Sequence, residues 1–328
     1  MLFRTEISLL STPFQINYAH KILLLGSCFS ENIGSWLESH YLDVMVNPFG
    51  IIYNPASAAN SLRLLLDEKE YQPHDLFKHQ GYYHSFDHHS RFSEADPDQM
   101  LCHLNQQRRQ ATRQLREADF LMVTFGTAWV YTLRTEGTVV SNCHKLPEKE
   151  FARRALSVTE IVETWIPLLE ELFAKNTRLK VLFTVSPIRH LKDTMHGNQL
   201  SKATLLLAID QLQKRFPEQT AYFPAYEILL DDLRDYRFYA SDMVHPSEMA
   251  IEYIRQKFAE SYFSADTKKL FTECEKIRRA LEHRPSDPNS VNYKRFLTQN
   301  IEKLNQLIDK NPFFTLRKPL MLFQERLK

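Results

Sequence analysis

A serine, an aspartate and a histidine in this sequence have the types and spacing that could do chemistry together. Ser27 follows a glycine at the end of a short apolar run, and Asp242 and His245 stand three residues apart late in the chain. A serine hydroxyl is a weak nucleophile, which needs an imidazole to accept its proton and a carboxylate to hold that imidazole in the right tautomer. These residues therefore predict acyl transfer, with Ser27 as nucleophile, His245 as base and Asp242 as the orienting carboxylate. The simpler alternative is that Ser27 caps a helix and that His245 is a surface histidine.

The negative charge that develops in acyl transfer needs N–H donors beside the nucleophile. Ser27 stands where a helix should begin, so backbone amides and the positive end of the helix dipole would lie next to it. Gly50 could bring a further backbone N–H close, because a glycine lets the chain approach a ligand. Backbone N–H groups beside Ser27 and at Gly50 are therefore candidates for an oxyanion hole.

Cys28, the residue after Ser27, offers a thiol as a second possible nucleophile. A cysteine one residue into a helix behind a buried strand is more often a small apolar core residue. Adjacent side chains on a turn also point in different directions, so only one of the two can face His245. We interpret Cys28 as part of the core.

The elements that must position these residues alternate along the chain. Short apolar runs, typical of strands buried on both faces, cover residues 22–25, 42–46, 120–125, 180–185 and 220–223. Helical patterns lie between and after them, over residues 31–40, 55–66, 98–117, 157–174, 200–216 and 246–263. Strands that alternate with helices favour parallel pairing through right-handed crossovers, which predicts a three-layer α/β/α sandwich.

Ligands bind at the carboxyl ends of the strands in an open parallel sheet. Arg189 and His190 follow the fourth apolar run, so they should face the mouth of the cleft and contact an anionic or hydroxyl-rich substrate. Residues 68–97 are rich in His, Tyr and Phe without clear periodicity, and we expect an insertion near the active-site face. His88 and His89 in this segment are candidate substrate contacts. The histidines and the aspartate of the insertion match no known metal-site spacing, so no metal is expected.

The remaining residues predict a helical extension. Residues 265–282 and 290–309 form charged amphipathic patterns with no strand between them. We therefore expect a catalytic domain over residues 1–263 and a helical C-terminal extension over residues 264–328.

Composition excludes several classes of protein. The charge sum of 41 − 40 = +1 gives no basic field for nucleic acid. The four cysteines are too scattered for a disulfide framework or a zinc site, and no G-x-G-x-x-G pattern for a dinucleotide follows the first strand. The longest uncharged run, residues 120–133, is too short to span a bilayer, and the first residues are not typical of a secretion signal. A cytoplasmic protein with no cofactor and no membrane span is expected.

Several sequence blocks, in order, resemble the GSCFA-domain family of the broader SGNH (GDSL-like) hydrolase group. The blocks are GSCF at residues 26–29, NPFG at 47–50, TFGTAW at 124–129, VSPIRH at 185–190 and Asp-x-x-His-Pro at 242–246. The resemblance implies a flavodoxin-like parallel sheet of the SGNH hydrolase type. It also implies the roles given above for Ser27, His245, Asp242 and Gly50. A third oxyanion donor, an asparagine in the wider group, is replaced here by Thr127, whose hydroxyl can donate.

The functional prediction is a serine esterase that removes a small acyl group, such as acetyl, from a carbohydrate or a related small molecule. An O-acyltransferase with the same residues is an alternative, because both reactions pass through the same acyl-serine. A catalytically silent binding module on the same fold is the third possibility. The sequence does not indicate an oligomeric state.

Overall fold

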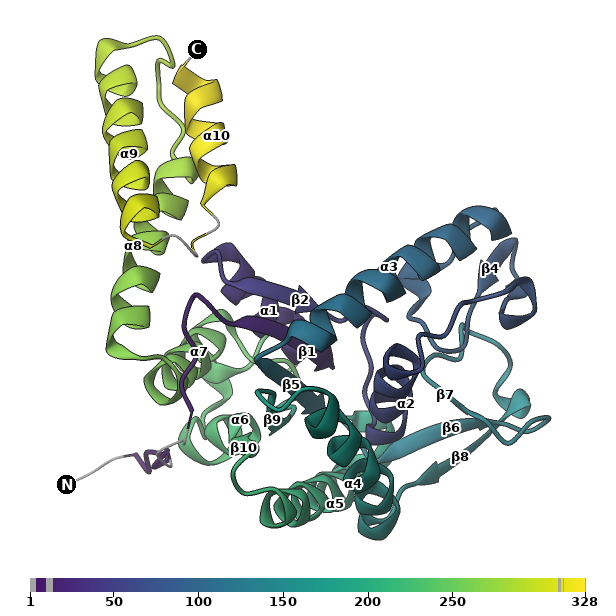
Figure 1. The fold of residues 1–328 in the computed structure, drawn as a ribbon. Helices are drawn as coiled ribbons and strands as arrows, with labels where there is room; N and C mark the ends of the chain where they lie inside the picture. Colours follow the sequence, from purple (N-terminus) through teal and green to yellow (C-terminus); the bar gives the residue numbers. More distant parts are fainter. Residues whose placement is uncertain (1–3, 10–13, 312–313, 315, 328) are drawn as a thin grey trace.

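The computed structural model describes residues 4–9, 14–311, 314 and 316–327. Within these residues, a five-stranded sheet in the order β10-β9-β5-β1-β2 forms the centre (Figure 1). Its strands are β1 (Lys21–Gly26), β2 (Asp43–Val46), β5 (Phe120–Phe125), β9 (Lys180–Val185) and β10 (Thr220–Phe223). All neighbouring strands pair in parallel. The α/β fold with a parallel sheet that the sequence predicts is confirmed.

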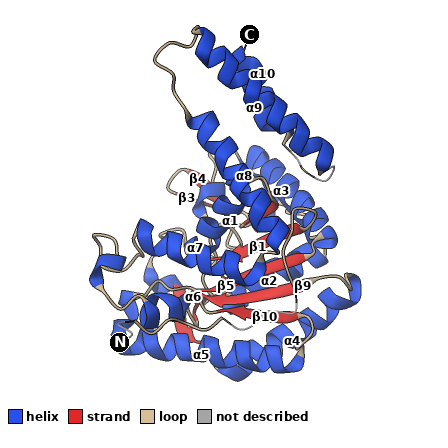
Figure 2. Ribbon diagram, turned by 90° about the vertical axis from the view of Figure 1, so that its left-hand side faces the viewer, coloured by secondary structure: helices blue, strands red, loops and turns tan. Residues whose placement is uncertain are grey.

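Helices cover both faces of this sheet (Figure 2). They are α1 (Cys28–Ser39), α2 (Pro55–Leu66), α3 (Pro97–Glu117), α4 (Val158–Lys175), α5 (Thr194–Arg215) and α7 (Glu248–Tyr262). Alternate residues of β1 enter two different cores: Leu23 and Leu25 pack with α2 to α5, whereas Ile22 and Leu24 pack with α1 and α7. Because side chains alternate along a strand, a sheet that is covered on both faces needs the continuous apolar runs seen in the sequence.

Local signals explain where the chain turns from strand to helix. Asn54 caps α2 and Ser157 forms a capping box with Glu160 at the start of α4. Gly26 ends β1 with φ +142°, and a Cβ added there would lie 2.3 Å from the carbonyl oxygen of Thr124. Only glycine fits this close approach, which sets the turn that leads into α1.

Two excursions from the sheet carry further strands. Residues 68–97 contain the hairpin β3 (Phe77–His79) and β4 (Tyr82–His84). The other excursion, which the sequence reading missed, is an antiparallel sheet of β6 (Trp129–Leu133), β7 (Val139–Val140) and β8 (Phe151–Ala155). Short helical turns complete the connections, at Pro73–Asp75, Ser90–Phe92, Glu148–Glu150, Leu191–Asp193, Ala225–Glu227 (α6), Ile228–Asp232 and Tyr236–Phe238.

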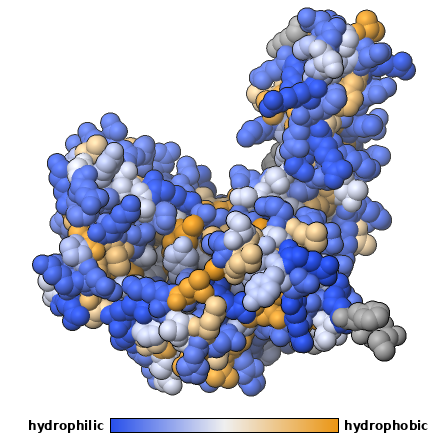
Figure 3. Space-filling model, turned by 180° about the vertical axis from the view of Figure 1, so that it is seen from behind, coloured by the Kyte–Doolittle hydropathy of each residue, from blue (hydrophilic) through white to orange (hydrophobic). Residues whose placement is uncertain are grey.

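The C-terminal part of the chain is helical, as the sequence predicts. It consists of α8 (Ala265–Glu282), α9 (Val291–Lys310) and α10 (Arg317–Leu327), of which only α10 lacks a sequence prediction. These helices stand out from the main body, and their surface is mostly hydrophilic (Figures 1 and 3). Their buried residues Cys274 and Leu297 nevertheless belong to the same apolar cluster as Ile22 and Leu24 of β1. The division into separate domains at residue 263 stays a prediction.

Within the described ranges, no helix is both long and apolar enough to cross a membrane.

Candidate active site

A cleft of about 640 Å³ opens at the carboxyl ends of the central strands. Different elements line it: the first turn of α1, the segments after β5 and β9, the excursion β6–β8, and the loop before α7. Its lining residues include Cys28, Tyr53, Asn54, Thr127, Trp129, Tyr131, Asn142, Cys143, Arg153, Arg189, His190, Asp242 and His245. The fold thus brings most of the chemically interesting sequence blocks to one edge, where parallel sheets bind ligands.

Asp242 and His245 form a tight pair in this cleft. The Nδ1 atom of His245 lies 2.6 Å from Oδ2 of Asp242, and Oδ1 of Asp242 accepts the backbone N–H groups of His245 and Val244 at 2.9 Å each. These amides, with the imidazole, lower the pKa of Asp242 to about 2, so its carboxylate is ionised at neutral pH. A carboxylate on Nδ1 fixes the tautomer in which Nε2 is available as a base.

Ser27 lies in different surroundings from this pair. Ser27 is only 1% exposed, it is not among the residues that line the cleft, and its Oγ accepts the backbone N–H of Phe29 at 3.2 Å as the cap of α1. In the described part of the chain, no hydrogen bond joins Ser27 to His245. The half-buried Cys28 does line the cleft. The first turn of α1 therefore presents the thiol, and not the hydroxyl, to the space that His245 borders.

The predicted oxyanion donors differ in availability. The N–H of Gly50 donates to the carbonyl of Asn47 at 2.7 Å, inside a turn, so it is already used. The N–H of Thr127 donates to the carbonyl of Tyr53 at 3.0 Å, and its hydroxyl lies 3.1 Å from Oγ of Ser201. Outside the ladder hydrogen bonds of strands and helices, the structure describes no acceptor for the amide of Cys28. It remains available because the first N–H groups of a helix have no partner within it. The amide of Ser27 precedes the helix and lies beside the Thr124 end of β5.

Two of the predicted substrate contacts lie in the cleft. Arg189 donates to the hydroxyl of Tyr239 at 3.1 Å, and the ring of His190 meets that of Tyr53 edge-on, with centroids 5.7 Å apart. Burial, with a contribution from the nearby Lys202, lowers the pKa of His190 to about 4. His190 is therefore neutral at physiological pH and can both donate and accept a hydrogen bond.

The other two predicted contacts lie elsewhere. His88 is 1% exposed, lies 3.1 Å from the hydroxyl of Ser85 and stacks on Phe49, and burial lowers its pKa to about 3. His89 accepts the N–H of Arg91 at 3.2 Å and packs against Gly50. Neither lines the cleft. The insertion folds back toward α2 and α3, which buries His88 and leaves His89 half-buried outside the cleft.

The excursion β6–β8 supplies the wall that the sequence reading did not assign. The guanidinium of Arg153 lies 4.1 Å from the centre of the Trp129 ring and 5.5 Å from that of Tyr131, and it pairs with Asp193. The result is a pair of aromatic rings held by one shared cation. The alternation of large and β-branched residues in β6 was a signal for a half-buried strand, although it gave no hint of what the strand faces.

A buried lysine lies close to the cleft. Lys202 is 1% exposed and donates to the carbonyls of Gly126 at 2.6 Å and Ser186 at 2.7 Å, which follow β5 and β9. Burial lowers its pKa to about 7. Nothing in the sequence marks this lysine, because its helix carries polar residues at most neighbouring positions.

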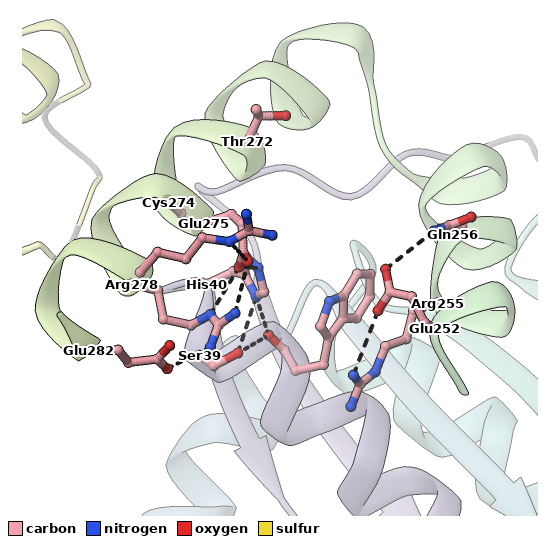
Figure 4. Close-up of polar contacts among 12 residues, drawn as sticks. Ser39, His40, Glu252, Arg255, Gln256, Thr272, Cys274, Glu275, Arg278 and Glu282 are labelled. Atoms are coloured by element: carbon pink, nitrogen blue, oxygen red, sulfur yellow. Dashed lines mark hydrogen bonds and ion pairs between the residues drawn. The ribbon is translucent and has the colours of Figure 1, made fainter. Parts of the chain in front are cut away.

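A second cavity, of about 810 Å³, lies where α1, α7 and α8 meet (Figure 4). Glu275 of α8 accepts Arg278, Arg279 and the Nε2 atom of His40, and this pairing lowers its pKa to about 2. His40 also stacks on Phe271, with ring centroids 3.8 Å apart. This network ties the C-terminal helices to the main body. No group of His, Cys, Asp or Glu suited to a metal ion occurs within the described residues.

The fold and the cleft define the class of this molecule: it is an α/β protein with a five-stranded parallel sheet and a cleft at the carboxyl edge of that sheet. More narrowly, the chain belongs to the GSCFA family, whose model matches residues 21–258. A second family model matches residues 274–328 and is described as "GSCFA domain protein, C-terminal domain". The predicted family is thereby confirmed.

Two solved structures of esterases resemble the chain distantly. An acetyl xylan esterase from the rumen bacterium Butyrivibrio proteoclasticus shares 11% identity at a TM-score of 0.37, over 74% of this chain and 63% of that one. A carbohydrate esterase, described as having divergent catalytic and non-catalytic binding functions, shares 12% identity at a TM-score of 0.34, over 76% and 66%. The chain thus spans less than two thirds of the length of either. A comparison with curated proteins found no match.

Proposed function

We propose that this GSCFA protein is an acyl-transfer enzyme that hydrolyses a small O-acyl ester of a carbohydrate. The observation that carries the proposal is the pairing of His245 with Asp242, at 2.6 Å, in a cleft at the carboxyl edge of the sheet. An aspartate that is ionised and held by two amides keeps the imidazole oriented. Its Nε2 atom is then placed to take a proton from a nucleophile or from water.

The first turn of α1 supplies the nucleophile in this proposal. The sequence predicts Ser27 for this role, and Cys28 is the adjacent alternative. Attack on the ester carbonyl forms a covalent acyl-enzyme and releases the alcohol, after which water regenerates the enzyme. The amide of Cys28, together with the N-terminal end of the α1 dipole, would stabilise the oxyanion.

The lining of the cleft supports a carbohydrate substrate. Trp129, Tyr131 and Tyr53 line the cleft, and aromatic side chains of this kind can pack on the C–H faces of a sugar. Neutral His190 and the charged Arg189 add hydrogen-bond partners for hydroxyl groups. The same residues could serve an O-acyltransferase, in which an acceptor hydroxyl replaces water.

Hydrolysis of 4-nitrophenyl acetate and of an acetylated sugar tests the proposal. His245→Asn should lower kcat/KM by roughly 10²–10⁴-fold, as the loss of a general base does. His103→Asn is a matched control, because His103 is also exposed and paired with a carboxylate, that of Glu94, but lies on α3 away from the cleft. Equal activity of the two variants would refute the proposal. Faster turnover of the ester when a free sugar is added would favour the acyltransferase.

A further inference from the structure

The first turn of α1 offers two neighbouring nucleophiles, and their surroundings differ. Ser27 is 1% exposed, and its Oγ is engaged with the N–H of Phe29. Cys28 lines the cleft together with Asp242 and His245. A substrate that reaches His245 through this cleft therefore meets the thiol first.

A buried cation lies near this thiol. Lys202 uses two of its three ammonium hydrogens on the carbonyls of Gly126 and Ser186. Its Nζ also lies 5.6 Å from the centre of the Tyr226 ring, but no carboxylate within the described ranges pairs with it, although a buried charge is costly without an anion nearby. The Gly126 carbonyl that accepts Lys202 directly precedes Thr127, which lines the cleft together with Cys28. Cys28 and Lys202 also act on each other's pKa, and the thiolate is the anion that this site can form.

Charged and titratable groups on three elements surround the thiol. Burial raises the pKa of Cys28, and Glu31 on its own helix acts in the same direction. The N–H groups of Cys28 and Phe29 and the ammonium of Lys202 lower it. Tyr53, before α2, is the third neighbour, and its own pKa is raised by burial and by Cys28. The thiolate and the ammonium each favour the charged form of the other, so the ionisation of Cys28 should depend on Lys202.

We propose that Cys28 is the nucleophile of the acyl transfer and that Lys202 is a positioning residue that stabilises its thiolate. This inference rests on the proposed function and replaces Ser27 in it. The Cys28 sulfur attacks the ester carbonyl, the C–O bond to the alcohol breaks, and the thiol proton passes through Nε2 of His245 to the departing alkoxide. The products are an S-acyl thioester on Cys28 and the free alcohol. Water then attacks the thioester, which gives the carboxylic acid and restores the thiol.

The chain contains internal reference thiols for testing this assignment. Cys143 lines the same cleft, where burial raises its pKa to about 11, and Cys102 is exposed on α3. Limited alkylation with iodoacetamide, followed by mass spectrometry of the peptides, measures all three rates in the same molecules. At pH 7, Cys28 should react at least tenfold faster than Cys143. A Cys28 rate equal to or below that of Cys143 would overturn the inference, and this comparison needs no variant.

The role of Lys202 is tested by Lys202→Met across pH 6 to 9. Loss of the ammonium should move the rise of Cys28 alkylation to higher pH and reduce its rate at pH 7 at least fivefold, while the Cys102 rate stays constant. A general loosening of the fold would instead speed up alkylation of the buried Cys274. An unchanged Cys28 profile with intact Cys102 and Cys274 rates would refute the part played by Lys202.

Activity separates this inference from the proposed function. Cys28→Ala should lose at least ten times more esterase activity than Ser27→Ala, and neutral hydroxylamine should release the acyl group from the trapped wild-type enzyme, as it does from thioesters. Esterase activity that depends on His245 but survives in Cys28→Ala would overturn the inference and leave the proposed function standing. Absence of esterase activity from the wild type would overturn the proposed function, whereas fast alkylation of Cys28 would still support an activated thiol.

Discussion

Replacing Gly26 by alanine should cost clearly more stability than the same change at Gly81, another glycine with positive φ. Gly26 ends β1 at φ +142°, and the new Cβ would lie 2.3 Å from the Thr124 carbonyl oxygen and 2.9 Å from Oγ of Ser30. The nearest obstacle is backbone of the paired strand β5, which cannot rotate away as a side chain can. Either β1 and β5 separate locally or the turn into α1 changes.

The cost of this substitution has two parts. A side chain at this φ is strained by about 1–3 kcal/mol. Overpacking in a closely packed core adds about 1–3 kcal/mol. The sum, about 2–6 kcal/mol, is a large fraction of the 5–15 kcal/mol that typically separates folded from unfolded protein. Cys28 and the first amides of α1 lie only two residues after Gly26. A shift of the backbone at Gly26 should therefore lower esterase activity as well as stability.

Urea denaturation of the Gly26→Ala and Gly81→Ala variants measures this cost. Gly81 also has a positive φ, +86°, but nothing lies within 4 Å of an added Cβ, so its variant reports the strain alone. The loss at Gly26 should exceed the loss at Gly81 by about 1–3 kcal/mol, the overpacking part. Equal losses of unfolding free energy in the two variants would show that β5 accommodates the added methyl group without loss of stability, and would refute the reasoning.

Other predictions concern Asp242 in the cleft, His88 in the insertion and Glu275, which joins the C-terminal helices to the main body. Asp242→Asn should keep the fold but lower kcat by roughly 10²–10⁴-fold, because the amide cannot hold the imidazole in the required tautomer. Circular dichroism checks the fold, and steady-state ester hydrolysis measures kcat. Near-normal turnover would mean that Asp242 does not orient the base. His88, whose pKa burial lowers to about 3, takes up a proton near pH 6.5 only when unfolded, so stability should fall as the pH drops from 6.5 toward 3. His88→Phe should flatten this fall in urea titrations at pH 7, 6, 5 and 4, and an unchanged slope would contradict the assignment. Glu275→Gln should lose about 1 kcal/mol at pH 7, a value reduced by solvent screening. Because pairing lowers the pKa of Glu275 to about 2, wild type and variant should converge in stability as the pH falls from 4.5 toward 2, and a difference that persists at pH 2 would exclude the ionic origin.

The sequence predicted the central sheet because its strands are buried on both faces. Such strands are nearly continuous apolar runs, and the caps Asn54 and Ser157 mark the helices between them. The strand β6 escaped notice because it is only half buried and directly follows β5, so the two merge into one uncharged run. The very short strands β3, β4 and β7 carry too few residues for any period to be visible.

The candidate site was predictable where contacts are local in sequence. Asp242 and His245 meet across three residues, so their pairing follows from the turn that joins them. The exposure of Cys28 depends on how the first turn of α1 is oriented over the sheet. This orientation cannot be predicted from the pattern of residues in one sequence. Lys202 lies beside the cleft only because α5 packs against β9 and β10, and this tertiary packing overrides the usual exposure of lysine.

The shared core between α1 and the C-terminal helices affects the order in which the chain can fold during synthesis. Phe271 packs against Trp36 with ring centroids 4.8 Å apart, and Phe314 meets Tyr18 at 4.5 Å. At 5–20 residues per second, a ribosome needs roughly 15–60 s to make Phe314 after Tyr18 has been added. For that time the aromatic surface of the α1 layer lacks its cover. The nascent protein therefore exposes a binding surface for chaperones that the finished protein has buried.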